Sequence, residues 1–239
     1  MMKHFIFLFA TILFFNTSTG FSQSTKTFFN EADMFFKTYV SNGKVDYKSI
    51  EKNPEKLNRL LNQAAKISVS TSEEKNYQVF WINAYNLAVI KGIIDNYPIE
   101  SPLDKDGFFD RIKYNLGGTS LTLNEIENKK LRANFDEPRF HFVLVCGAKG
   151  CPPIIAEAYK ASILEEQLQE QTVKALNNPS FIKVSENEVA ISEIFKWYKE
   201  DFVKNGQTEI DFLNRFRKEK IPSNYKVSYY PYNWQLNQK

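Results

Sequence analysis

The chain has 239 residues, of which 43% are hydrophobic and 25% are charged, with 31 Lys and Arg against 28 Asp and Glu. This composition is typical of a folded globular protein and excludes a disordered chain. A net charge of +3 without a basic run also argues against nucleic-acid binding. Only two Cys and two His are present, so nucleophilic or metal chemistry has few residues available.

Residues 1–22 have the pattern of a secretory signal peptide. A lysine and a histidine give a basic start, residues 5–15 are apolar apart from one threonine, and small and polar residues follow. The alternative is a membrane anchor, but the apolar run is much shorter than the roughly 20 residues that span a bilayer. We therefore expect a secreted or periplasmic protein without a membrane span after cleavage, with a single globular domain over residues 23–239.

Apolar residues at helical spacing predict three helices in the first half of the mature chain. The first covers residues 28–40 and the second covers residues 54–66. The third begins near Thr71, which with Glu74 has the spacing of a capping box, and ends before Pro98. Because this helix is apolar on more than half of its circumference, we expect it to be central.

A hairpin is predicted next, over residues 111–123 with a Gly-Gly turn at 117–118. Thr122 and Glu125 give a second capping box, for a short helix at about 123–131. Residues 140–146 are almost continuously apolar, which is typical of a buried central strand.

Helices outweigh strands in the remaining chain, and the strands are short. The sequence therefore predicts an α+β fold, a helix-rich single domain with a small, mainly antiparallel sheet. The expected elements are helices at 162–176, 192–204 and 208–219, and strands at 180–184, 188–191 and 225–229.

The strongest chemical signal lies within residues 141–151, which hold every Cys and His of the expected mature chain. Cys151 follows a glycine-containing turn and precedes two prolines, which suits the start of a helix, where a thiolate is stabilised. His141 would be its base. On a strand His141 and Cys146 would point to opposite faces, so Cys151 is the better partner.

Other interpretations of these three residues remain open. Cys146 and Cys151 can form a local disulfide in an oxidising compartment, or Cys146 can be a buried thiol. His141 can be a structural histidine. The spacing matches no standard zinc site, so we expect no metal and no cofactor.

The central helix carries a second candidate group around Trp81 and Tyr85. Asn83 and Asn86 are three residues apart and share a helix face. Asparagine is costly to bury without partners, so these side chains are expected either to bind or orient a ligand or to tie the helix to a buried loop.

Four segments together carry a family resemblance. They are FWINAYNLAVIKGIIDNYP, SLTLNEIENKKLR, EPRFHFVLVCGAKGCPP and YYPYNWQLN, in this order between about residues 75 and 236. They resemble the domain-of-unknown-function 547 (DUF547) family, which includes secreted bacterial members. The resemblance implies that the Asn83–Asn86 helix, the Glu127 region and the segment from His141 to Cys151 are family hallmarks, and it implies no defined reaction. A central helix on short strands also resembles, at the level of fold, papain-like and transglutaminase-like enzymes.

Two functions follow from these observations. The first is a thiol-dependent hydrolase or acyltransferase acting on amide or ester bonds, with Cys151 as nucleophile, His141 as base, and Asn83, Asn86 or Glu127 orienting the histidine or the substrate. The alternative is a non-enzymatic module that binds a small molecule or peptide in a cleft lined by aromatic and asparagine side chains, with Cys146 and Cys151 as a structural pair. The aromatic tail near Trp234 is expected to pack onto the core rather than to bind a partner.

Overall fold

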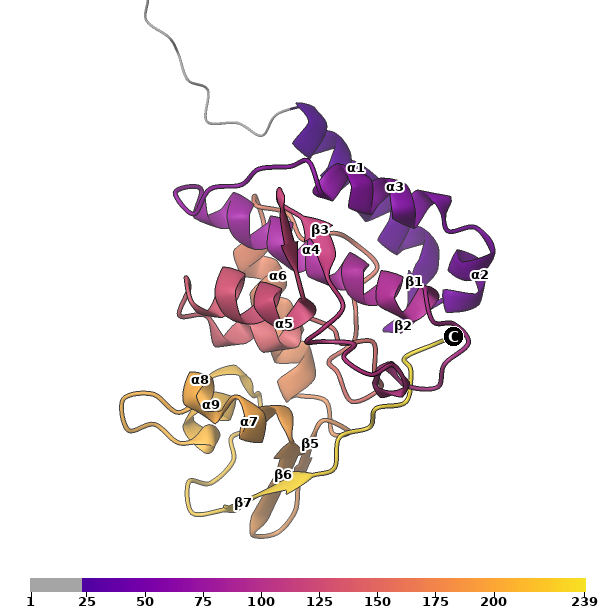
Figure 1. Cartoon of the computed structure of the whole chain (residues 1–239). Coiled ribbons are helices and arrows are strands. Elements are labelled where there is room, and N and C mark those ends of the chain that lie inside the picture. Colours follow the sequence, from indigo (N-terminus) through magenta and orange to yellow (C-terminus); the bar gives the residue numbers. More distant parts are fainter. Residues whose placement is uncertain (1–22) are drawn as a thin grey trace, which may run out of the picture.

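The computed structural model describes residues 23–239, so the predicted signal peptide at 1–22 lies outside the described residues. Helices form one end of the molecule, the β5–β7 sheet and short helices form the other, and α4 runs between them (Figure 1). The helices are α1 (Gln23–Tyr39), α2 (Tyr47–Lys52), α3 (Glu55–Ala64), α4 (Glu74–Ile94), α5 (Leu123–Glu125), α6 (Leu164–Leu176), α7 (Ile194–Trp197), α8 (Lys199–Phe202) and α9 (Glu209–Phe216). The strands are β1 (Val40–Ser41), β2 (Lys44–Val45), β3 (Tyr114–Leu116), β4 (Thr119–Leu121), β5 (Ile182–Val184), β6 (Glu188–Ser192) and β7 (Lys226–Tyr230).

This arrangement confirms the helix-rich α+β prediction. Strand pairs β1–β2, β3–β4 and β5–β6 are antiparallel, and β7 adds to β6 in parallel. In the part of the chain that the structure describes, no helix is long and apolar enough to cross a membrane.

Helix α4 is the centre of the fold, as its apolar circumference predicted. Every residue from Val79 to Ile90 is buried. Phe80 packs on Phe28 of α1, and Trp81 lies against the turn of the β3–β4 hairpin. Gly117 in that turn has a φ of +61°, and an added Cβ would lie 2.7 Å from the Trp81 ring. The glycine is therefore required both by the backbone and by the close packing.

The start of α4 differs from the prediction, whereas the next predicted cap is confirmed. The N-cap of α4 is Glu73, which makes no side-chain capping bond, so the capping box proposed for Thr71 and Glu74 is wrong. Thr122 does form a reciprocal capping box with Glu125 at the start of α5. The helix continues as a π-helix, η2 (Ile126–Arg132).

The predicted strand at 140–146 is wrong. A 3-10 helix, η3 (Pro138–Phe142), takes its place and continues as an irregular, buried segment. Glu137 caps this turn by accepting from the Arg139 amide, and Pro138 sits at its first position, where its fixed φ fits. The apolar run therefore predicted burial correctly but not the backbone conformation, because a short apolar run is compatible with a strand and with a buried helical segment.

The C-terminal tail after β7 runs back along the molecule to the β1–β2 hairpin (Figure 1). The amides of Lys149 and Gly150 donate to the tail carbonyls of Gln235 and Asn233, and the Val45 amide donates to Asn237. The tail thus joins segments that are far apart in sequence. The expectation that it packs onto the core is confirmed.

Candidate functional site

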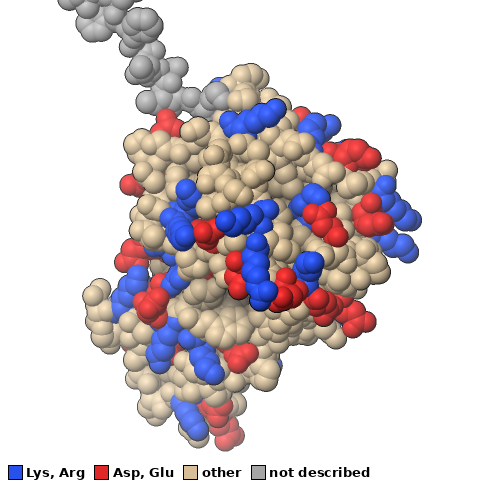
Figure 2. Space-filling model, viewed as in Figure 1, with Lys and Arg blue, Asp and Glu red and all other residues tan. Residues whose placement is uncertain are grey.

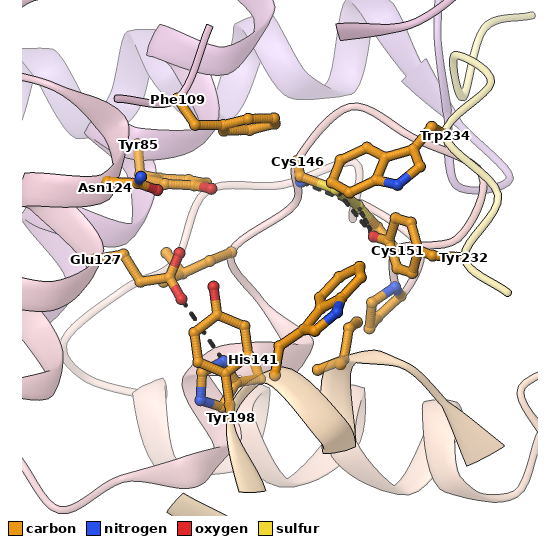
Figure 3. A pocket seen from close by; sticks show the side chains of 14 residues that line it. Tyr85, Phe109, Asn124, Glu127, His141, Cys146, Cys151, Tyr198, Tyr232 and Trp234 are labelled. Atoms are coloured by element: carbon orange, nitrogen blue, oxygen red, sulfur yellow. Dashed lines mark hydrogen bonds and ion pairs between the residues drawn. A yellow bond between two sulfur atoms is a disulfide. The ribbon is translucent and has the colours of Figure 1, made fainter. Parts of the chain in front are cut away.

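A cavity of about 260 Å³ lies between α4, the π-helix, the segment around the two cysteines, and the C-terminal part of the chain. Figure 3 shows the side chains that line it. They are Tyr85, Phe109, Asn124, Glu127, His141, Leu144, Cys146, Cys151, Pro152, Ile194, Trp197, Tyr198, Tyr232 and Trp234. The structure therefore brings His141, both cysteines, Glu127 and Tyr85 to one site.

Glu127 supplies the carboxylate of this cavity. It lies in the π-helix, a rare conformation that places an extra residue in the turn and is frequent at functional sites. Glu127 is 7% exposed. Its carboxylate points into the cavity beside Tyr198 (Figure 3).

His141 is held in the cavity wall from three directions. Its Nε2 lies 2.7 Å from Oδ2 of Asp201. Its ring centroid lies 4.1 Å from that of Tyr198, and its Nδ1 lies 3.8 Å from Oε1 of Glu127. The side chain is 3% exposed, so the imidazole has one fixed orientation.

Asp201 determines which nitrogen of His141 carries the proton. Burial by itself would raise the pKa of Asp201, but hydrogen bonds from His141 and Arg132 hold it well below its usual range. The Arg132 contact, from Nε to Oδ2, is 2.6 Å long. An ionised carboxylate can only accept, so Nε2 of His141 carries a proton and donates it to Asp201.

Three tyrosine hydroxyls complete the polar lining. Burial raises the pKa of Tyr85, Tyr198 and Tyr232 above the ordinary tyrosine value, and the nearby Glu127 adds to the effect at each of them. The hydroxyls therefore stay protonated near neutral pH. They are available as hydrogen-bond donors to a ligand or to the carboxylate.

Cys146 and Cys151 form a disulfide in this structure. The Tyr232 hydroxyl lies 3.0 Å from Sγ of Cys146 and 2.9 Å from Sγ of Cys151. A disulfide sulfur carries no thiolate, so the described state does not contain the nucleophile expected at Cys151. Thiol chemistry at this position stays a prediction for the reduced protein.

Asn83 and Asn86 are buried, and neither lines the cavity. Asn83 donates to the Tyr159 carbonyl at 2.9 Å and accepts from the Tyr159 amide at 3.0 Å. Asn86 donates to the Val143 carbonyl and accepts from the Val145 amide, both at 2.9 Å. Both side chains tie α4 to buried loops, which is the second of the two roles that the sequence left open.

Trp81 also lies away from the cavity. It packs on Tyr77, Phe80 and the hairpin turn, and Nζ of Lys130 lies 5.3 Å above its ring. Within residues 23–239 no group of three His, Cys, Asp or Glu side chains is arranged to hold a metal ion.

Residues 69–174 match a family described as "Protein of unknown function, DUF547". This segment is therefore similar to the DUF547 family, in agreement with the resemblance of the sequence motifs. Neither the curated proteins nor the solved structures gave a significant match.

The DUF547 segment supplies one side of the cavity, with Tyr85, Glu127, His141 and the disulfide. The other side comes from residues after it. Trp197, Tyr198, Tyr232 and Trp234 close this wall.

No pattern in the sequence pointed to Asp201 or placed Tyr198, Tyr232 or Trp234 at the site. Asp201 is one of two adjacent acidic residues in the four-residue helix α8. No spacing rule links a residue at 201 to a histidine at 141, since the contact depends on how the chain returns to the DUF547 segment. The density of aromatic residues between 225 and 234 was the available signal for the aromatic wall.

Proposed function

We propose that this protein is a secreted or periplasmic binding protein whose cavity holds a small molecule. One observation carries the proposal: Glu127 and His141, both nearly buried, face one aromatic-walled cavity of about 260 Å³. Binding sites typically combine apolar walls with a few placed polar groups. The location is supported by the pattern of residues 1–22 and by the disulfide, which persists in oxidising compartments.

The test is a ligand-observed NMR screen of a chemically mixed fragment library against the wild-type protein and a variant with the cavity filled. Asn124→Trp is suited to the filling, because Asn124 is exposed at the cavity rim and its backbone hydrogen bonds would be retained. Asn62→Trp, at an exposed site on α3, is the matched control.

We expect fragments that bind the wild type and Asn62→Trp but lose binding in Asn124→Trp. Two results would overturn the proposal. One is a screen in which no fragment binds the wild type, and the other is binding that Asn124→Trp leaves unchanged although the variant retains its circular dichroism spectrum.

A thiol-dependent hydrolase or acyltransferase is the second candidate, favoured by the presence of Cys151 and His141 in the wall of the same cavity. His141 would take the thiol proton, and the Cys151 thiolate would attack the carbonyl carbon of an amide or ester to form a thioester. The C–N or C–O bond would break, the proton would pass from His141 to the leaving amine or alcohol, and water or another nucleophile would then cleave the thioester and restore the thiol. This requires prior reduction of the disulfide by an external dithiol.

The two candidates differ in the state of the cysteines. Mass spectrometry of the unreduced secreted protein should show a mass lower by two hydrogens than after reduction if the pair is structural. The thiol enzyme would instead be supported if, at about pH 7 and without reductant, iodoacetamide labels Cys151 faster than it does in the unfolded protein.

A further inference from the structure

The geometry points to a ligand class: we propose that the cavity binds a small organic ammonium ion, held between the Glu127 carboxylate and aromatic faces. This rests on the proposed binding function and specifies what the same site takes.

The lining carries a carboxylate and no permanent cation. Among the residues 23–239 that form the wall, none is Lys or Arg. Arg132 is not part of the lining; its guanidinium lies 4.9 Å from the centre of the Tyr198 ring, and it is paired with Asp201 and with Glu200. Its single positive charge therefore already faces two carboxylates besides Glu127.

Glu127 itself is incompletely neutralised by its neighbours. Its contact with Nδ1 of His141 is 3.8 Å, which is longer than a hydrogen bond. The neighbouring Tyr198 hydroxyl stays protonated and therefore supplies no positive charge. A nearly buried carboxylate is costly unless it is paired, so a cation that enters the cavity would restore the balance.

The aromatic wall suits such a cation. Trp197 and Trp234 stack at 5.8 Å with an angle of 24° between their planes, and Tyr232 packs against both at 5.0 and 4.7 Å. Phe109 adjoins Trp234 at 6.0 Å. Aromatic faces attract ammonium groups, most strongly where water is excluded, and aromatic cages are a common way to bind substituted ammonium ions.

The charge and the rings face the same space. Figure 3 shows Glu127 on one side of the cavity, with Trp234 and Tyr232 on the opposite side. An ammonium group between them would meet the carboxylate and the ring faces together. An anionic ligand would meet the carboxylate without a lysine or arginine to offset it.

The test compares choline with 3,3-dimethylbutan-1-ol, which has nearly the same shape and no charge. Isothermal titration calorimetry of the wild-type protein should show choline binding more tightly by about tenfold or more, because only the charged probe gains the cation–π contact and the pairing with the carboxylate. This comparison needs no variant, so it does not depend on a mutant that folds.

Two variants separate the contributions of charge and ring. Glu127→Gln should remove most of the preference for choline, and Trp234→Leu should weaken choline more than its neutral analogue. Glu166→Gln, which removes one exposed acidic charge from α6, is the control and should leave the preference unchanged.

The outcomes distinguish this inference from the binding function. Equal affinity for both probes, or a preference that survives in folded Glu127→Gln, would overturn the ammonium inference, while fragment binding lost in Asn124→Trp would leave the binding function standing. A protein that binds no probe and no fragment would overturn both.

Discussion

Asn86 supplies hydrogen bonds to the backbone of the buried segment after His141, as a neighbouring strand would in a sheet. Its amide satisfies both the Val143 carbonyl and the Val145 amide inside the core. Buried backbone groups must be paired, and in this segment no strand is present to pair them. The side chain therefore allows an irregular backbone to carry His141 at one end and Cys146 at the other.

Asn86→Ala is expected to destabilise the protein by roughly 2–6 kcal/mol, because it leaves two buried backbone groups without partners at roughly 1–3 kcal/mol each. Urea unfolding followed by tryptophan fluorescence measures the change. Asn62→Ala, at an exposed position, should change the free energy of unfolding by less than about 0.5 kcal/mol. A similar, small change in both variants would contradict the role given to Asn86.

Asp201 is the residue through which the site becomes sensitive to acid. Because the folded state lowers the pKa of Asp201, its ionised form contributes stability above its unfolded pKa, and that contribution is lost as pH falls toward the folded pKa. We expect Asp201→Asn to be less stable than wild type at neutral pH and the difference to shrink steadily below about pH 4. Urea unfolding at several pH values measures it, and a difference independent of pH would contradict the assignment.

At the scale of elements, the α5–η2 segment determines where Glu127 points. The capping box fixes the start of α5, and the change from α to π geometry begins directly after it. A π-helix has more residues per turn than an α-helix, so side chains after the change point in different directions than they would in a continuous α-helix. Glu127 therefore faces the cavity, whereas Lys129 lies on the exposed face.

Thr122→Ala is expected to cost about 0.5–2 kcal/mol, the usual range for loss of an N-cap side chain. Thr71→Ala is the matched control, because Thr71 has the same sequence spacing but makes no cap, and it should have almost no effect. Thermal unfolding of both variants checks this. An equal loss of stability in the two variants would contradict a capping role for Thr122 alone.

At the scale of the whole molecule, the C-terminal tail closes the site. It brings Tyr232 and Trp234 to the cavity and joins the loop before Cys151 to the β1–β2 hairpin. Acidic and basic side chains are interspersed over the face shown in Figure 2, so on that face the charge pattern does not mark the site.

Removal of residues 232–239 is expected to release the segments that the tail joins. The amides of Val45, Lys149 and Gly150 should exchange with deuterium faster, since each donates to a tail carbonyl. The β5–β6 ladder does not involve the tail and serves as the internal control. Unchanged exchange at the three amides, or equally faster exchange everywhere, would contradict a local role for the tail.

The sequence by itself determined the helix-rich α+β class, the central position of α4, the hairpin at the Gly-Gly turn, and the grouping of His141, Cys146 and Cys151 in one short segment. These features follow from local periodicity, turn chemistry and composition, which act over a few residues. The tertiary structure decided the rest: the irregular backbone at 140–146, the Asp201 partner of His141, and the aromatic wall from the tail. Each depends on contacts between residues far apart in the chain, and no local pattern encodes such contacts.

The small number of Cys and His residues has a clearer meaning in three dimensions. His141, Cys146 and Cys151 lie within eleven residues of one another in the sequence, and residues so close along the chain are also close in space. The sequence could not decide between a thiol and a disulfide, which depends on how a loop folds back. It offered Glu127 as one residue that could orient the histidine, but it could not indicate Asp201, which reaches the ring from a helix 60 residues away.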